Sequence, residues 1–107
     1  MALDELLKRI KERLENLYGE RLKGVILYGS HARGDAGPDS DIDILCVLEG
    51  PILVYKEISA TVDAVSDLEL EMKDDYKPVS IIPVDREGFE SAACGFYREV
   101  RKEGIPL

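Results

Sequence analysis

Two aspartates in the first half of the chain have the spacing of a metal site. Asp41 and Asp43 begin an apolar run, Ile42 to Leu48, whose β-branched side chains predict a buried strand. Side chains two apart in a strand share one face, so the carboxylates point the same way. At ~4 Å and an effective dielectric of ~20, their repulsion is about 4 kcal/mol. We therefore expect a cation between them, and Mg²⁺ takes oxygen ligands while leaving positions open for phosphate.

A glycine and a serine supply the complementary phosphate-binding group. Gly29-Ser30 ends a second apolar run, Val25 to Tyr28, which also predicts a buried strand. A residue without Cβ lets backbone approach a phosphate, and the amides that follow can point at it. Arg33 adds a guanidinium for the same anion. No Gly-Lys-Ser/Thr follows the glycines, which excludes a Walker-type phosphate loop.

Each of these residues also has an ordinary structural interpretation. The Gly-Ser pair alone would form a turn, Asp41 could cap a turn, and Asp43 could be a solvated strand residue. Their joint spacing favours the metal and phosphate site. Arg33 fits a phosphate contact or a surface position equally well. His31 is the only histidine, and because nothing in sequence places a nucleophile or an orienting acid beside it, we interpret it as a loop residue.

The spacing of these residues resembles that of a known superfamily. Gly29-Ser30, ten residues and then Asp41-Ile42-Asp43 resembles the signature of the polymerase-beta-like nucleotidyltransferases. The fuller string GSHARGDAGPDSDIDILCVL and the ending VRKEGIPL are similar to the minimal nucleotidyltransferase domain. The resemblance implies Gly29 and Ser30 at the nucleotide phosphates, and Asp41 and Asp43 as catalytic ligands of Mg²⁺. It implies transfer of a nucleoside monophosphate, AMP from ATP, to a hydroxyl.

The resemblance also implies a protein partner. Minimal members are commonly encoded with a helical HEPN-domain protein, and act as its antitoxin by adding AMP to a partner tyrosine. A HEPN-type acceptor is thus implied here. The alternative is a catalytically weakened module that binds a nucleotide or a partner protein and regulates it by contact. An antibiotic-modifying role is disfavoured, because such enzymes normally carry an extra acceptor domain.

Ser80 departs from the family pattern. A third carboxylate usually comes from the strand after the long helix, and the matching stretch, Val79 to Ile82, puts Ser80 there. A serine cannot replace an anionic ligand, so the departure favours the binding-module alternative. Four acids in nearby predicted loops could stand in for it: Asp74, Asp75, Asp85 and Glu87.

Apolar periodicity predicts the elements that position these residues. A leucine-rich stripe predicts a helix of about four turns ending near Gly19, and a loop, His31 to Ser40, links the first two strands. A second stripe predicts a long helix from Gly50-Pro51 to about Lys73, with the proline in its first turn. The stripe consists of Val54, Ile58, Val62, Val65, Leu68 and Met72.

The last third of the chain predicts a strand and a helix. Val79 to Val84 reads as a third strand, and Pro83 indicates that it lies near an edge. Glu87 to Ala93 predicts a short helix or turn. A last helix runs through Phe96 to Lys102 and stops at Gly104 and Pro106.

This order of elements predicts one α/β domain over residues 1–107, with helices packed on a small sheet. The resemblance refines it to the nucleotidyltransferase fold, a mixed sheet in which strands two and three are adjacent.

Charge and composition limit the partners and the compartment. The formal charge of -8 and pI near 4.6 repel free nucleic acid. Cys46 and Cys94 lack further ligands nearby and are expected to be buried free thiols in a reducing compartment. The start, MALDELLKRI, is charged and amphipathic, and no apolar run approaches ~18 residues. We therefore expect a cytoplasmic protein without a membrane contact.

Overall fold

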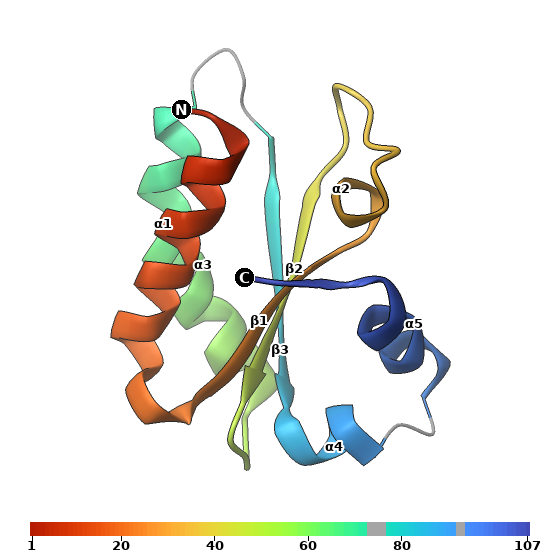
Figure 1. Cartoon of the computed structure of the whole chain (residues 1–107). Coiled ribbons are helices and arrows are strands. Elements are labelled where there is room, and N and C mark those ends of the chain that lie inside the picture. Colours follow the sequence, from red (N-terminus) through yellow and green to blue (C-terminus); the bar gives the residue numbers. More distant parts are fainter. Residues whose placement is uncertain (73–76, 92–93) are drawn as a thin grey trace.

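The computed structural model describes residues 1–72, 77–91 and 94–107, which form a four-stranded sheet with helices on both faces (Figure 1). In chain order the elements are α1 (Leu3–Tyr18), a 3-10 turn η1 (Gly19–Arg21), β1 (Leu22–Tyr28), α2 (Ser30–Arg33), β2 (Ile42–Leu48), α3 (Val54–Glu71), β3 (Val79–Asp85), α4 (Arg86–Ser91), α5 (Gly95–Glu103) and β4 (Ile105–Pro106).

The sheet has the order β3-β2-β1-β4 and is mixed. β1 runs antiparallel to β2 and to β4, and β2 runs parallel to β3. The α/β fold class and the adjacency of the second and third strands are therefore confirmed. β3 lies at one edge, as Pro83 predicted, where a residue without an N–H costs no ladder hydrogen bond.

The two faces of the sheet carry different cores. α1 and α3 lie side by side on one face, and α4 and α5 lie on the other (Figure 1). Alternate residues of β2 divide between the faces, since side chains alternate along a strand. The α1/α3 face buries Ile42, Ile44, Cys46 and Leu48, whereas the α5 face buries Leu45 and Val47 with Val84, Phe89 and Val100.

The helices differ from the sequence prediction in several details. α3 begins at Val54 instead of Pro51, and the expected end at Lys73 and the Asp74-Asp75 pair lie outside the described residues. The predicted stripe is only half buried: Val65, Leu68 and Met72 are in the core, but Val54, Ile58 and Val62 are 41–55% exposed. The first turns of α3 instead bury Glu57 and Thr61.

Hydrogen bonds and an ion pair, mostly with α1 and η1, make that polar burial possible. The Tyr18 hydroxyl donates to Glu57 Oε1 at 3.3 Å, and Arg21 Nη2 lies 3.7 Å from Glu57 Oε2. The Thr61 hydroxyl donates to the backbone oxygen of Ile58 at 2.9 Å. Because these buried polar groups have partners, their burial costs little free energy. The apolar side chains of Val54, Ile58 and Val62 therefore face solvent in this part of α3.

Three short elements, η1, α2 and β4, were not predicted from the sequence. α2 interrupts the predicted loop His31 to Ser40, and β4 follows the stop signal at Gly104. β4 pairs with β1 at Ile26 and Leu27, and the Leu107 amide donates to the Val25 oxygen at 2.8 Å. The last residues of the chain thereby form the second edge of the sheet.

The two cysteines have different environments. Cys46 is buried on the α1/α3 face, as predicted, and burial raises the pKa of its thiol to about 12. Cys94 is exposed, so the prediction that it is buried was wrong. It precedes α5 as an extended residue instead of lying on the helix face that packs against the sheet. Among the described residues no helix is both long and apolar enough to cross a membrane.

Candidate functional site

The antiparallel pairing of β1 and β2 brings the two predicted motifs together. Tyr28, the last residue of β1, pairs with Asp43 on β2, so Gly29-Ser30 follows directly beside that aspartate. Asp41 comes one residue before β2 begins. Both motifs therefore meet at one end of the sheet, on the α5 face.

Gly29 is the point of closest approach between the motifs. Its φ is 74°, a left-handed conformation that favours glycine, and a Cβ built there would overlap the Asp43 carboxylate. The Gly29 oxygen accepts hydrogen bonds from the Ala32 and Arg33 amides, each at 3.1 Å, which begins α2. Only glycine permits this turn and this contact together.

The environment of Asp43 disfavours its ionised form. Partial burial, followed by the charge of Asp41, raises its pKa, while His31 and Arg33 oppose that shift. The charge of Asp41 acts on Asp43 in the direction expected of two carboxylates two residues apart at the start of a strand. Two repelling carboxylate groups at a strand end match the oxygen donor set that Mg²⁺ prefers.

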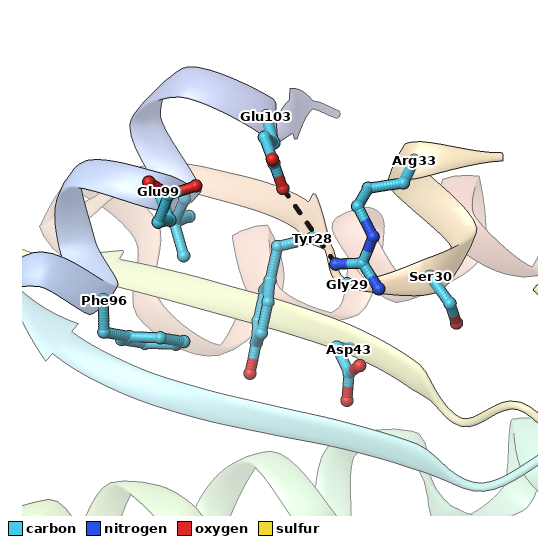
Figure 2. Close-up of a pocket in the computed structure, with 9 residues that line it drawn as sticks. Tyr28, Gly29, Ser30, Arg33, Asp43, Phe96, Glu99 and Glu103 are labelled. Atoms are coloured by element: carbon cyan, nitrogen blue, oxygen red, sulfur yellow. Dashed lines mark ion pairs between the residues drawn. The ribbon is translucent and has the colours of Figure 1, made fainter. Parts of the chain in front are cut away.

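A pocket of about 480 Å³ opens over these residues (Figure 2). Its lining includes four of the five predicted site residues, namely Gly29, Ser30, Arg33 and Asp43. Asp41 is exposed and does not line the pocket. The remaining lining residues are Tyr28, Phe96, Glu99, Val100 and Glu103. The volume is in the range of small-molecule sites.

The contribution of α5 was not predicted from the sequence. Phe96, Glu99, Val100 and Glu103 have the spacing i, i+3, i+4 and i+7, which places them on one helix face. That face covers β1 and turns two carboxylates and an aromatic ring into the pocket (Figure 2). The spacing was available in the sequence, but nothing local indicated which polar group the face would meet.

Arg33 lies between acids of two elements. Its Nε is 3.3 Å from Asp35 Oδ2, and its Nη1 is 4.0 Å from Glu103 Oε2 (Figure 2). The side chain is 46% exposed, so these ion pairs are weak and can exchange for a stronger anion. Of the two positions left open by the sequence, the structure shows Arg33 at the pocket.

His31 supports the site without facing a nucleophile. Its Nε2 lies 3.2 Å from the Ser40 backbone oxygen, to which it donates when that nitrogen is protonated. This contact ties α2 to the residue that precedes Asp41. The prediction that His31 is a loop residue was wrong, because the hydrogen bonds to the Gly29 oxygen start a helical turn there and His31 lies in α2. Its contact reaches from that helix to the loop residue Ser40.

Ser80 lies in register with Asp43 on the neighbouring strand. The residues of such a pair point to the same face of a sheet, so Ser80 is beside the aspartate and is exposed. In residues 1–72, 77–91 and 94–107, no group of three or more His, Cys, Asp or Glu side chains is placed to hold a metal ion. Asp41 and Asp43 have no third carboxylate with them in that part of the chain.

The alternative acids suggested by the sequence lie elsewhere. Asp85 pairs with Leu48 at the far end of β3, five residues from Ser80 or roughly 16 Å along the strand. Its carboxylate accepts the Gly88 amide at 2.7 Å. Glu87 belongs to α4 at that same end. The interpretation that either could act at Asp43 was wrong, and Asp74 and Asp75 are outside the described residues.

The fold and this site define a class of nucleotide-transferring domains. The family model described as "Nucleotidyltransferase domain" matches residues 7–104, which contain all the site residues above. The chain belongs to this nucleotidyltransferase family. Its resemblance to the minimal members of the family is also borne out by the relatives and structures described next.

One curated relative is similar in sequence to part of this chain. A Methanocaldococcus jannaschii protein, provisionally named protein adenylyltransferase, is 38% identical over 58 residues. The match covers 53% of this chain and 59% of that protein, so the chain spans about three-fifths of the relative's length.

Solved structures are similar over nearly the whole chain. A provisionally assigned nucleotidyltransferase from Sulfolobus solfataricus is 24% identical with a TM-score of 0.66, covering 95% of this chain and 76% of that one. A toxin-antitoxin structure with AMP-PNP is 18% identical with a TM-score of 0.60, covering 92% and 69%. Both likenesses concern the fold alone. A provisionally assigned minimal nucleotidyltransferase is 25% identical with a TM-score of 0.52, covering 100% and 97%.

Proposed function

We propose that this protein transfers AMP from ATP to a hydroxyl on a partner protein. Asp41 and Asp43 hold Mg²⁺, while Gly29, Ser30 and Arg33 bind the phosphates. The observation that carries the proposal is the contact between the motifs: the Asp43 carboxylate is seated against Gly29, where a Cβ would not fit. Asp41 and Asp43 would hold a metal next to the residues that would bind the phosphates.

The metal, when bound, would neutralise the charge that develops on the transferring phosphoryl group. The chain's own residues position the reactants. Gly29 and Ser30 hold the phosphates against the end of β1, and Arg33 can exchange Glu103 for a phosphate oxygen. The acceptor oxygen bonds to the α-phosphorus, the bond from that phosphorus to the β-phosphate oxygen breaks, and pyrophosphate leaves. The hydroxyl proton passes to solvent, because Ser80 offers no carboxylate to receive it.

A partner protein as acceptor is supported by the comparisons. The Methanocaldococcus jannaschii relative is named for protein adenylylation, and the fold neighbour with AMP-PNP is a toxin-antitoxin structure. By the family resemblance, the partner is a HEPN-type toxin and its acceptor group is a tyrosine. We also propose that residues 1–107 act as one domain, since both apolar clusters share a single sheet. Two free cysteines support a reducing compartment, and we propose the cytoplasm.

The second candidate is a binding module that regulates its partner by contact. Ser80 favours it, because the position in register with Asp43 lacks a carboxylate. A missing general base typically costs about 10²–10⁴-fold in rate. The enzyme must bind Mg–ATP and transfer AMP, whereas the module acts through a retained nucleotide pocket or through its partner surface alone and transfers no AMP.

Incorporation of labelled AMP into the protein encoded beside this one tests the two candidates. Wild type is expected to transfer slowly, and Ser80→Asp faster, because the exposed position next to Asp43 has room for a carboxylate. Asp41→Asn with Asp43→Asn is the inactive control. Absence of transfer by both wild type and Ser80→Asp, despite Mg–ATP binding, would establish the binding module. Robust wild-type transfer that Ser80→Asp does not improve would show that Ser80 is not a deficit.

A further inference from the structure

The pocket has two chemically different ends. Arg33 and Ser30 lie at one end and Phe96 at the other, with Tyr28 and Asp43 between them (Figure 2). The first end offers a cation and a turn of backbone. The second offers an aromatic ring from α5. A ligand that fills the pocket must therefore be anionic at one end and flat or apolar at the other.

Phe96 is held in place but left uncovered. Its ring meets Tyr28 edge-to-face, with centroids 5.5 Å apart and planes at 83°, and it also contacts Tyr97 at 5.7 Å. Such contacts orient a ring while leaving area for another partner. Phe96 is still 44% exposed. An oriented aromatic side chain at the wall of a pocket is a ready surface for a second π-system.

The acids of α5 set the direction of the ligand. Glu99 lies one turn from Phe96 and lines the pocket, and among the described residues it has no hydrogen-bond or ion-pair partner. Glu103 lies at the other end of the same face, but its charge is offset by the Arg33 guanidinium 4.0 Å away, which Glu99 lacks. A phosphate beside Glu99 would be repelled, whereas a sugar hydroxyl or a base amine can donate a hydrogen bond to it. The phosphates therefore belong at Arg33 and the nucleoside at Phe96.

The length of α5 suits this arrangement. Seven residues separate Phe96 from Glu103, a rise of about 10 Å along the helix. The helix face thus runs from the aromatic end of the pocket to the end where Arg33 lies. A nucleoside with its phosphates attached can follow it.

We infer that Phe96 is the nucleobase-stacking residue of this pocket, with Glu99 facing the nucleoside. The inference rests on the proposed function, because it assigns the part of ATP that the phosphate-binding residues do not contact. Loss of a stacking aromatic typically weakens binding by roughly 5- to 150-fold. The ring has no role in holding the phosphates.

Comparison of Mg–ATP with Mg–tripolyphosphate by calorimetry tests the inference. Wild type should bind ATP more tightly than tripolyphosphate. Phe96→Ala should weaken ATP binding by roughly 5- to 150-fold and leave tripolyphosphate binding unchanged. The matched control is Tyr55→Ala, which removes a 76%-exposed aromatic from α3, on the opposite face of the sheet. It should leave binding of both ligands unchanged.

A second variant gives an optical signal that is independent of affinity. The sequence has no tryptophan, so Phe96→Trp introduces a single one. Its fluorescence should change on addition of Mg–ATP and stay constant with Mg–tripolyphosphate, and ATP affinity should be retained because indole also stacks.

The outcomes separate the inference from the proposed function. Wild-type affinity for ATP in Phe96→Ala would overturn the inference and leave the proposed function standing. Equal weakening of ATP and tripolyphosphate would show a structural role for Phe96 and also overturn the inference. Loss of AMP transfer with unchanged ATP binding would place the ring against the acceptor, which contradicts base stacking. Absence of Mg–ATP binding by wild type would overturn the proposed function, and the inference with it.

Discussion

The two faces of the sheet give one strand, β2, two different environments, a closed core and an open pocket. On the α1/α3 face, Ile42, Ile44 and Cys46 of β2 are all 0% exposed. On the α5 face the same strand begins with Asp43, next to a pocket, and becomes apolar only at Leu45 and Val47. The buried residues on the α1/α3 face hold β2 in place, and Asp43 on the other face lines the pocket.

A partly buried carboxylate such as Asp43 can be accommodated in a strand whose opposite face is well packed. Asp43 is partly buried and repelled by Asp41, a cost in the absence of a cation. Its neighbours in sequence, Ile42 and Ile44, are fully buried in the other core and compensate for that cost. Substitutions on the two faces should therefore have opposite effects on stability and binding.

The largest expected effect is on the closed face. Ile44→Ala should lower the free energy of unfolding by about 2–5 kcal/mol, because it removes buried methyl groups and leaves a cavity. Urea denaturation measures the change. Asp43→Asn, one residue away on the open face, should cause no such loss. An equal loss of stability in both variants would contradict the claim that the α1/α3 face stabilises the fold and Asp43 does not.

The second prediction compares two glycines with positive φ. Gly29 and Gly34 have φ values of 74° and 83°, so alanine strains either position, by about 1–3 kcal/mol. Only at Gly29 would the Cβ meet Asp43, whereas nothing lies within 4 Å of a Cβ at Gly34. Gly29→Ala should therefore reduce AMP transfer by about 10²-fold, as a displacement of ~1 Å can. Transfer by Gly34→Ala should stay near the wild-type rate, and an equal loss in both would count against the contact.

A smaller effect concerns stability and pH without ligand. The raised pKa of Asp43 means that its ionised form destabilises the fold. Asp43→Asn should raise Tm at neutral pH, where wild type is ionised. The gap should close as pH falls through the raised pKa toward the ordinary value of 3.8, since wild type then becomes neutral too. Thermal unfolding of both proteins at neutral pH and near pH 3.8 measures the difference in Tm. A difference that widens in acid would contradict the prediction.

Local sequence was enough to find the two motifs that the structure brings together. Strand alternation and a Gly-Ser turn are properties of adjacent residues, so Asp41, Asp43 and Gly29-Ser30 could be found without a fold. The α5 residues could not, because the approach of Phe96 to Tyr28 depends on tertiary packing across 68 positions.

The failures have the same physical origin. The outward rotation of Ile58 and Val62 follows from the partners of Glu57, which come from α1 and η1. β4 is too short to show the alternation of a strand, and it forms because β1 has a free edge with which it can pair.

The sequence pattern placed Ser80 at the position of the missing carboxylate, and its register with Asp43 agrees with that placement.

Calorimetric titration of Mg–ATP into wild type and the Asp41→Asn plus Asp43→Asn variant tests the central claim most directly. Asp39→Asn plus Asp63→Asn removes the same charge from exposed positions and serves as the matched control. His31→Ala should have a small effect, because its contact is with the loop. If Asp41 and Asp43 hold the metal, Mg–ATP binding is lost in the Asp41/Asp43 variant and kept in the control. Unchanged Mg–ATP affinity in the Asp41/Asp43 variant would contradict it.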